Sequence, residues 1–478
     1  MKLNTLRQTY FSEIVILLLI IVSLILSISI VRNDYILPLI LAAVFILFII
    51  LKSNTFSILL LLILIFFGEG LVEYNLVPPQ IIWLTELVIY SLFIKALLSR
   101  LLRGEKFFLK FHNFVFIFFA ISVISYVINA FSIVHMFLFL RLMLRYYLLF
   151  LAVINLNFND KTISFINKAI VFLFIIQIPT AAIKLFIFGQ GERAIGTYGY
   201  HGGGNSTAIP MIAISFLMAL FFYYKPSRLY VLLSIGFVAF GIMGGKRAIV
   251  FFLPILLFFI GAFLLKDKRI GLKYLFVGSL FIIVLGYSCL RLIPTLNPQR
   301  QIGGEFNLAH LKSFALNYTT RMNADRSAGR LATTMNVFKI LKDEGFLNVM
   351  FGFGPGSYIE TMFKDLKNTL KEKGSLPIVY GVTGLSWLAL QIGYPGTIIY
   401  LFLFLAMMIA SLKFSSRESR KYWKAFNFGM FGFSFVMVFL SIFYSPVFGS
   451  DLIPLIYFLL AAFMITQSQK QKTEQVYE

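Results

Sequence analysis

The sequence predicts an all-α protein that crosses a membrane many times. Its 478 residues are 59% hydrophobic and only 13% charged, and the mean hydropathy is +0.88. Apolar runs close to the roughly 20 residues that a transmembrane helix needs recur along most of the chain. The first run, 14–31, is too long for a signal-peptide core and lacks a small-residue cleavage site, so we expect it to be retained as a helix.

Hydropathy predicts about 12–14 transmembrane helices, and the basic residues predict their orientation. If the N-terminus is cytoplasmic, the connections rich in Lys and Arg are cytoplasmic too, whereas 132–136 and 446–450 on the other side contain neither. This positive-inside pattern accounts for most of the net charge of +22, so no nucleic-acid partner is needed and both termini are expected in the cytoplasm. The predicted spans are 14–31, 35–51, 55–68, 80–98, 114–134, 137–155, 163–188, 208–224, 228–244, 248–265, 273–292, 384–412, 424–445 and 450–466.

This layout divides the chain into three segments. We expect 1–292 to form an N-terminal bundle of about eleven helices, and 293–379 to form one large late extracytoplasmic loop. The last segment, 380–478, contains the final transmembrane helices and a cytoplasmic tail. The single cysteine, Cys289, lies in an apolar run, which excludes an intrachain disulfide and argues against a metal cluster, so we expect no metal and no cofactor.

The long loop is predicted to be ordered rather than flexible. Apolar residues at helical spacing predict a helix over 331–344, and Gly345 is expected to end it. Ser327 is a candidate N-cap, which would put Arg330 in the first helical turn. A cation is unfavourable there because the helix N-terminus is already partly positive, unless an anion is shared with it.

A glycine-rich turn and a second amphipathic helix are predicted later in the same loop. Three glycines and one proline in 352–356 suit neither helix nor strand and indicate a turn. Ser357 and Glu360 then have capping-box spacing and precede an apolar stripe with lysines between its members. Such a helix suits the membrane surface, where it could act as a lid; the alternative is an ordinary solvated helix packed on its neighbours.

Three stretches on the predicted outer face place arginine beside glycine or other small residues. They are the glycine-rich loop 189–210, the helix junction 241–252 and the long loop. Guanidinium groups match phosphate oxygens, and glycine lets backbone N–H groups approach, so the three together predict one anion site. Singly, each arginine could instead touch a lipid phosphate, and Arg330 could pair with Asp325 or Asp343. The cationic residues concerned are Arg193, Lys246, Arg247, Arg326 and Arg330.

Several short motifs between 190 and 400 follow one another in a defined order. They are Arg193 with Gly196 and Asn205–Ser206, GGKRAIVFF around Arg247, Gly329–Arg330, the helix 331–344, FGFGPGSY at 351–358, and VTGLSWLALQIGYPG at 382–396. In this order and spacing they resemble the O-antigen polymerase and ligase superfamily of bacterial envelope enzymes, and the hydropathy profile with one large late outer loop agrees.

This resemblance implies a GT-C-like glycosyltransferase in the bacterial cytoplasmic membrane that uses glycans carried on undecaprenyl diphosphate. Both donor and acceptor would be lipid-linked, with membrane lipids, a flippase and a chain-length regulator as further partners. Arg330 and Arg247 are expected to clamp the diphosphate, and Arg193 to contact phosphate or glycan, without a metal. The expected substrate-binding residues are Arg326, Lys246, Gly352, Gly354, Gly356 and Asn205.

One position departs from the ligase pattern. The ligases have a histidine at the start of the helix after the long loop, where this chain has Val382–Thr383. This favours a repeat-unit polymerase over a ligase that transfers polymer to lipid A core or a protein, and it leaves His201, Asp325 and Glu360 as alternative proton acceptors. A flippase or other transporter is the remaining alternative; the chain lacks two matching halves, and its charges are expected at the outer surface rather than at the membrane midplane.

Overall fold

The computed structural model consists entirely of helices and connections over the part of the chain that it describes. That part comprises residues 52–130, 132–189, 194–197, 205–245, 248–266, 296–301, 329–358, 382–444 and 452–477, with scattered positions elsewhere. Within it, nine helices or helix pairs are long and apolar enough to cross a membrane, and two shorter apolar helices accompany them. The prediction of an all-α polytopic membrane protein is confirmed.

The helices correspond to eleven of the predicted spans, and the remaining three, 14–31, 35–51 and 273–292, fall largely outside the described residues. The helices are α3 (Asn54–Glu73), α4 (Ile82–Leu102), α5 (His112–Asn129), α6 (Ile133–Asn155), α7 (Asp160–Ile175), α8 (Gln177–Phe188), α9 (Asn205–Ala219), α10 (Arg228–Met243), α11 (Ala248–Lys266), α14 (Arg330–Asp343), α15 (Phe346–Phe351), α16 (Gly384–Arg417), α17 (Lys421–Phe443) and α18 (Leu452–Tyr477).

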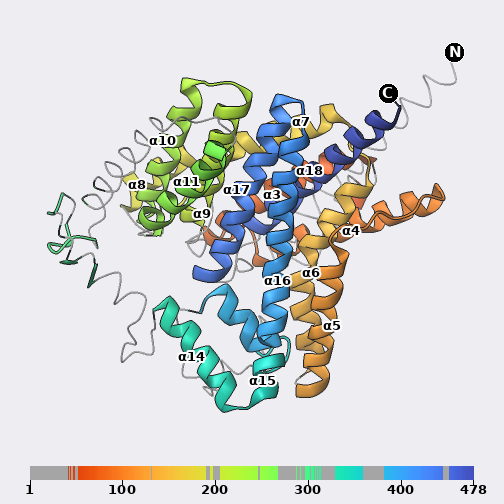
Figure 1. Cartoon of the computed structure of the whole chain (residues 1–478), viewed down its shortest axis with the longest axis horizontal. Coiled ribbons are helices and arrows are strands. Elements are labelled where there is room, and N and C mark those ends of the chain that lie inside the picture. The colour runs from red at the N-terminus through yellow and green to blue at the C-terminus, as the bar shows by residue number, and fades with distance from the viewer. Residues whose placement is uncertain are drawn as a thin grey trace.

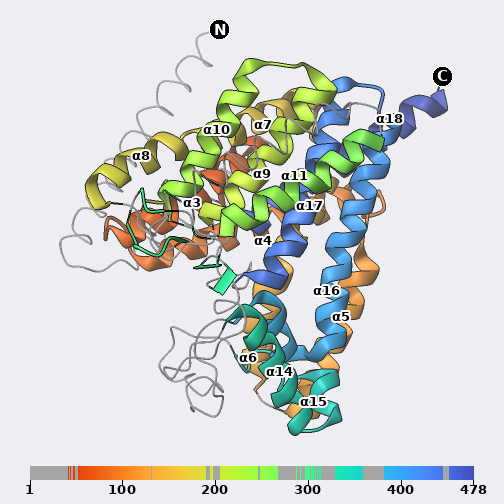
Figure 2. The same cartoon turned by 60° about the vertical axis from the view of Figure 1, so that its left-hand side comes forward.

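The loop helices α14 and α15 lie at one end of the bundle, together with the start of α16 (Figure 1). We call this the Arg330 end, because Arg330 is the first residue of α14. The last turns of α18 lie at the opposite end, and a second view shows the same separation (Figure 2). Early and late parts of the chain pack together along the bundle, with α16 against α5 and α17, α17 against α9, and α18 against α6.

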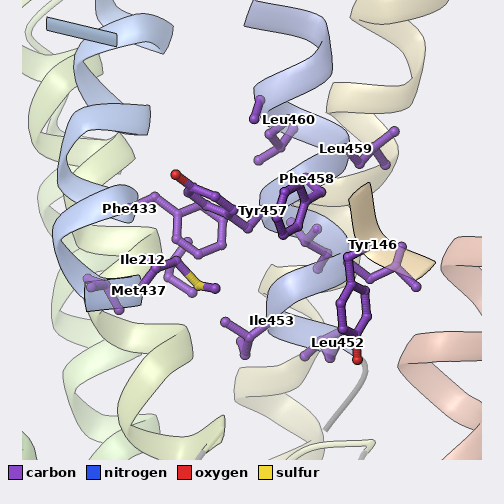
Figure 3. Close-up of a cluster of buried hydrophobic side chains, with 14 of the residues drawn as sticks. Tyr146, Ile212, Phe433, Met437, Leu452, Ile453, Tyr457, Phe458, Leu459 and Leu460 are labelled. Atoms are coloured by element: carbon purple, nitrogen blue, oxygen red, sulfur yellow. The ribbon is translucent and has the colours of Figure 1, made fainter. Parts of the chain in front are cut away.

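Aromatic side chains fill the centre of the bundle around Tyr457 of α18 (Figure 3). Its ring lies 5.0 Å from that of Phe433, and its hydroxyl is 2.9 Å from the Ser434 hydroxyl. Tyr146 of α6 stacks on Phe458 of α18 at 6.4 Å. Lipid chains are as apolar as these side chains, so close packing and buried hydrogen bonds are what hold such helices together.

The turn predicted at 352–356 is present and is fixed against a break in α16. The predicted span 384–412 is present as α16, and Gly393, with a φ of +73°, divides it into a short first segment and a longer second one. A side chain at Gly393 would overlap the carbonyl of Met350 in α15. A Cβ at Gly352 would lie 2.6 Å from the carbonyl carbon of Gln391, so each of these glycines lets one backbone approach the other.

Four further details differ from the sequence-based expectations. The N-cap of α14 is Gly329, so the assignment of Ser327 was wrong, although Arg330 does occupy the first turn and the helix ends next to Gly345 as expected. The helix expected to stop at 68 continues to Glu73, and the predicted span 163–188 is present as one span, Asp160–Phe188, in which α7 and α8 meet at Ile176. The short helix α15 between Gly345 and the turn was not predicted. The second amphipathic helix, beyond Ser357, lies outside the described residues.

A charged cluster joins α4 to α6 inside the bundle. Glu86 of α4 accepts from Arg141 Nε at 2.6 Å and from Arg145 Nη1 at 2.8 Å. Arg145 also donates to the Tyr146 hydroxyl at 2.7 Å, and its side chain is 6% exposed. A charged side chain is costly in lipid, and Arg145 lies inside the bundle with its countercharge beside it.

Candidate anion site at the Arg330 end

Arg330 is held at the tip of α14 by contacts with two other helices. Its Nη1 atom is 3.4 Å from the carbonyl oxygen of Val382, just before α16, and its guanidinium carbon lies 6.0 Å from the centroid of the Tyr444 ring. Among the described residues no carboxylate pairs with it. Asp343 is the last residue of the same helix, about 20 Å away along its axis, and Asp325 lies outside the described residues.

The position of Arg330 favours an anion beside it. Gly329, the N-cap of α14, offers no side chain to the free N–H groups of the first turn. Those N–H groups and the helix dipole make this end partly positive, and the guanidinium adds a full positive charge. An anion bound here would be stabilised by both at once.

Tyr444, the residue that follows α17, connects the ends of four helices at this site. Its hydroxyl is 3.1 Å from the Thr207 hydroxyl in the first turn of α9, and its carbonyl oxygen accepts the Gly384 N–H of α16 at 2.8 Å. Its ring faces Arg330 of α14. Three helix N-termini, those of α9, α14 and α16, therefore converge on the C-terminal end of α17.

Paired hydroxyl groups hold α14 and α16 together next to Arg330. The Thr334 hydroxyl, one turn into α14, is 3.1 Å from the Ser386 hydroxyl and 3.0 Å from the Arg330 carbonyl oxygen. Ser386 in turn contacts Thr383, the N-cap of α16, whose side chain accepts the Ser386 N–H at 3.2 Å. Thr383 stands where the ligase pattern would have histidine, and here it caps a helix.

The helix junction predicted to contribute Lys246 and Arg247 begins beside the same place. Gly244, just after α10, packs so closely on α9 that a Cβ there would lie 2.7 Å from the Cβ of Ser206. Ser206 is adjacent to Thr207, the partner of Tyr444. Each of the three predicted stretches thus has a described residue near this place. Gly244 packs on Ser206, and Tyr444 links the neighbouring Thr207 to Arg330.

Most of the predicted charged site residues cannot be compared with this geometry directly. Of the candidates, Arg330, Gly352, Gly354, Gly356 and Asn205 are described, and Asn205 is buried at the first residue of α9. Arg193, His201, Lys246, Arg247, Arg326 and Glu360 lie outside the described residues.

Backbone N–H groups of the glycine-rich turn, 352–356, join it to α15 and α16. The Gly352 N–H donates to the Asn348 carbonyl at 2.8 Å, which ends α15, and the Gly356 N–H donates to Oε1 of Gln391 in α16 at 2.9 Å. A side chain at Gly356 would overlap the carbonyl of His135 in α6. In this structure these two glycines therefore position the turn between α6 and α16, and Gly354, with a φ of +103°, completes it.

Buried residues that the sequence did not single out surround this turn. Trp387 of α16 donates from Nε1 to the Tyr358 carbonyl oxygen at 3.2 Å. Burial raises the pKa of the Tyr358 hydroxyl above its usual value. Both residues lie within motifs named above, at 351–358 and 382–396, but the sequence pattern assigned a role to neither, and Tyr444 has no local sequence signal.

Comparison with known proteins adds no family assignment. No family model matches the chain, and no curated protein matches it. Across the described residues, no three His, Cys, Asp or Glu side chains are grouped so that they could hold a metal ion.

Proposed function

We propose that this protein is a repeat-unit polymerase of the bacterial cytoplasmic membrane. It would transfer a growing glycan from undecaprenyl diphosphate to the next lipid-linked repeat unit, at the outer face of that membrane. The observation that carries the proposal is the arrangement around Tyr444: an arginine at a helix N-terminus, with two further helix N-termini beside it. The order of the motifs along the chain, with its resemblance to the O-antigen polymerases, is the second support.

The proposed reaction needs positive groups that stabilise a leaving diphosphate, and the arrangement around Arg330 offers such groups. The bond between the anomeric carbon and the diphosphate oxygen breaks, and negative charge grows on the leaving undecaprenyl diphosphate. Fixed guanidinium and N–H groups stabilise that charge without having to reorganise. A new glycosidic bond forms from an acceptor hydroxyl, whose proton passes to a base; His201, Asp325 and Glu360 remain the candidates for it.

Substitution of Arg330 tests the proposal. Arg330→Ala should lower the rate of chain elongation by about two to three orders of magnitude, as for loss of one donor to a developing anion. Arg330→Lys should also be poor, since an ammonium group cannot make the two-pronged contact with phosphate. Lys339→Ala, an exposed cation two and a half turns further along α14, is the matched control and should retain activity.

The assay should use purified protein in lipid with undecaprenyl-diphosphate-linked repeat units, and follow the ladder of products. Ladders that stay attached to undecaprenyl diphosphate support polymerisation. Transfer to lipid A core or to a protein would instead identify a ligase, and movement of labelled lipid across the bilayer without elongation would identify a transporter. Normal ladders from Arg330→Ala would remove this residue from the site.

A further inference from the structure

An apolar pocket lies between α7, α9, α10 and α17, away from the Arg330 end. Its volume is about 240 Å³, and the lining side chains include Phe174 of α7, Ile212 and Phe216 of α9, and Leu233 of α10. Only three polar side chains line it, Asn167, Tyr230 and Tyr422. Apolar cavities of about 150 Å³ already stay dry and accept small hydrocarbons, so this pocket suits a hydrocarbon chain.

The pocket opens towards the surrounding membrane between α7 and α10. Its floor is buried, with Ile212 only 2% exposed, whereas Val171 and Leu229 at its rim are 54% and 56% exposed. At the far end of this opening α8, which continues α7, packs on α10, whereas α7 itself packs on α3 and α10 packs on α9. A lipid chain could therefore enter sideways from the bilayer.

All three polar lining residues lie at one end of the pocket. Tyr230 is in the first turn of α10 and Tyr422 is the second residue of α17, while Asn167 is in the second turn of α7. The ring of Tyr422 is 5.8 Å from that of Tyr224, at the end of the π-helical turn that follows α9. These starts of α7, α10 and α17 lie at the end of the bundle opposite to Arg330, which the predicted orientation puts at the cytoplasmic face.

Exposed cations flank this polar end. Arg228 is the first residue of α10, Lys421 is the first residue of α17, and Lys168 follows Asn167. None of the three forms an ion pair with a described residue, because the nearby carboxylates Glu418 and Asp160 pair with other cations. Two of the three stand at helix N-termini, where a cation is unfavourable unless an anion is shared.

We propose that this pocket binds an anionic glycerophospholipid from the leaflet at that end, with one acyl chain between α7 and α10 and the phosphate beside Arg228 and Lys421. The charge selects an anionic head group, and the apolar walls bind the chain. The polyprenyl tail of the proposed substrate is the alternative occupant; with its diphosphate at the Arg330 end, it would leave Arg228 and Lys421 without an anion.

Retention of lipid by the purified full-length protein tests this proposal. The protein is incorporated into bilayer discs made of phosphatidylcholine with a minor fraction of phosphatidylglycerol, released in mild detergent, and analysed by native mass spectrometry. Wild type should retain one phosphatidylglycerol in preference to phosphatidylcholine. Leu233→Trp fills the pocket, so this variant should no longer retain phosphatidylglycerol. Leu232→Trp changes the neighbouring residue, which is 65% exposed, and should retain the lipid as wild type does.

Removal of charge gives an independent test that does not disturb the core. The double variant Arg228→Gln, Lys421→Gln should bind phosphatidylglycerol about thirtyfold more weakly, as expected for two lost cations near a membrane surface. Lys413→Gln, an exposed cation near the end of α16, is the control.

Three results would overturn the proposal. They are equal retention of phosphatidylcholine, unchanged retention in both Leu233→Trp and the double variant, and displacement of the bound lipid by undecaprenyl phosphate. Elongation activity is not the readout, so these outcomes stand apart from the fate of the proposed polymerase function.

Discussion

Glu86→Gln is the substitution whose effect on stability follows most directly from the structure. The carboxylate of Glu86 holds Arg141 and Arg145 at 2.6 and 2.8 Å and so ties α4 to α6. Glutamine has nearly the same shape but no charge, so the variant leaves two guanidinium groups facing a neutral amide.

The two arginines contribute very differently to the expected loss. Arg145 is 6% exposed, and removing the partner of a buried charge costs about 3–5 kcal/mol. Arg141 is 40% exposed, so its pair with Glu86 is worth no more than about 0.2–1 kcal/mol. Because Arg145 keeps its hydrogen bond to Tyr146, we expect Glu86→Gln to lower the free energy of unfolding by about 3 kcal/mol, at the low end of that range.

Arg141→Gln is the matched comparison, because it preserves the buried pair between Glu86 and Arg145. Arg141→Gln should lower the free energy of unfolding by about 1 kcal/mol or less. Equilibrium unfolding of both variants in mixed micelles, followed by tryptophan fluorescence, measures the difference. Equal losses in the two variants, or a loss below about 1 kcal/mol for Glu86→Gln, would refute the assignment of Glu86 as the countercharge of a buried arginine.

Three further predictions, each with its own variants, test the packing around the site. Gly393→Ala should lower the free energy of unfolding by about 2–5 kcal/mol, because the residue has a positive φ and faces a carbonyl of α15. Gly68→Ala, with open space around it, should be neutral or mildly stabilising. Thermal unfolding in detergent measures the difference between the two variants. Ser125→Ala removes the hydroxyl that binds carbonyls of both α15 and α16, and a loss of about 1–2 kcal/mol is expected in the same assay. Tyr444→Phe removes only the hydroxyl contact with Thr207 and should largely retain elongation activity, whereas Tyr444→Ala, which also removes the ring facing Arg330, should not; equal activities would exclude the ring as a support for this arginine.

The transmembrane helices were largely predictable because their length and hydropathy are local properties of the sequence. The division between α7 and α8 near Ile176 was not predicted, although Pro179 marks it in the sequence, because a proline there has no N–H to donate to the Ile175 carbonyl oxygen. Gly393 and Pro395 likewise mark the break in α16, within a long apolar run that predicts a membrane span. What decides it is the close contact with α15, which is non-local.

The candidate site shows the same division between local and non-local information. Arg330 could be predicted, because a cation at a helix start beside glycine is a local pattern. Tyr444 could not, since its importance comes from Thr207 and Gly384, which are far from it in the sequence. Glu86 was missed for a similar reason: its arginine partners lie 55 and 59 residues away.

A structure of the protein with a bound undecaprenyl diphosphate analogue tests the convergence of cationic groups most directly. We expect the two phosphates at the N-terminus of α14, with Arg330 within about 2.7–2.9 Å of a phosphate oxygen and with Arg193 or Arg247 contacting the same diphosphate. A diphosphate bound at the opposite end of the bundle, or one that Arg330 does not touch while Arg193 and Arg247 point elsewhere, would contradict the proposed site.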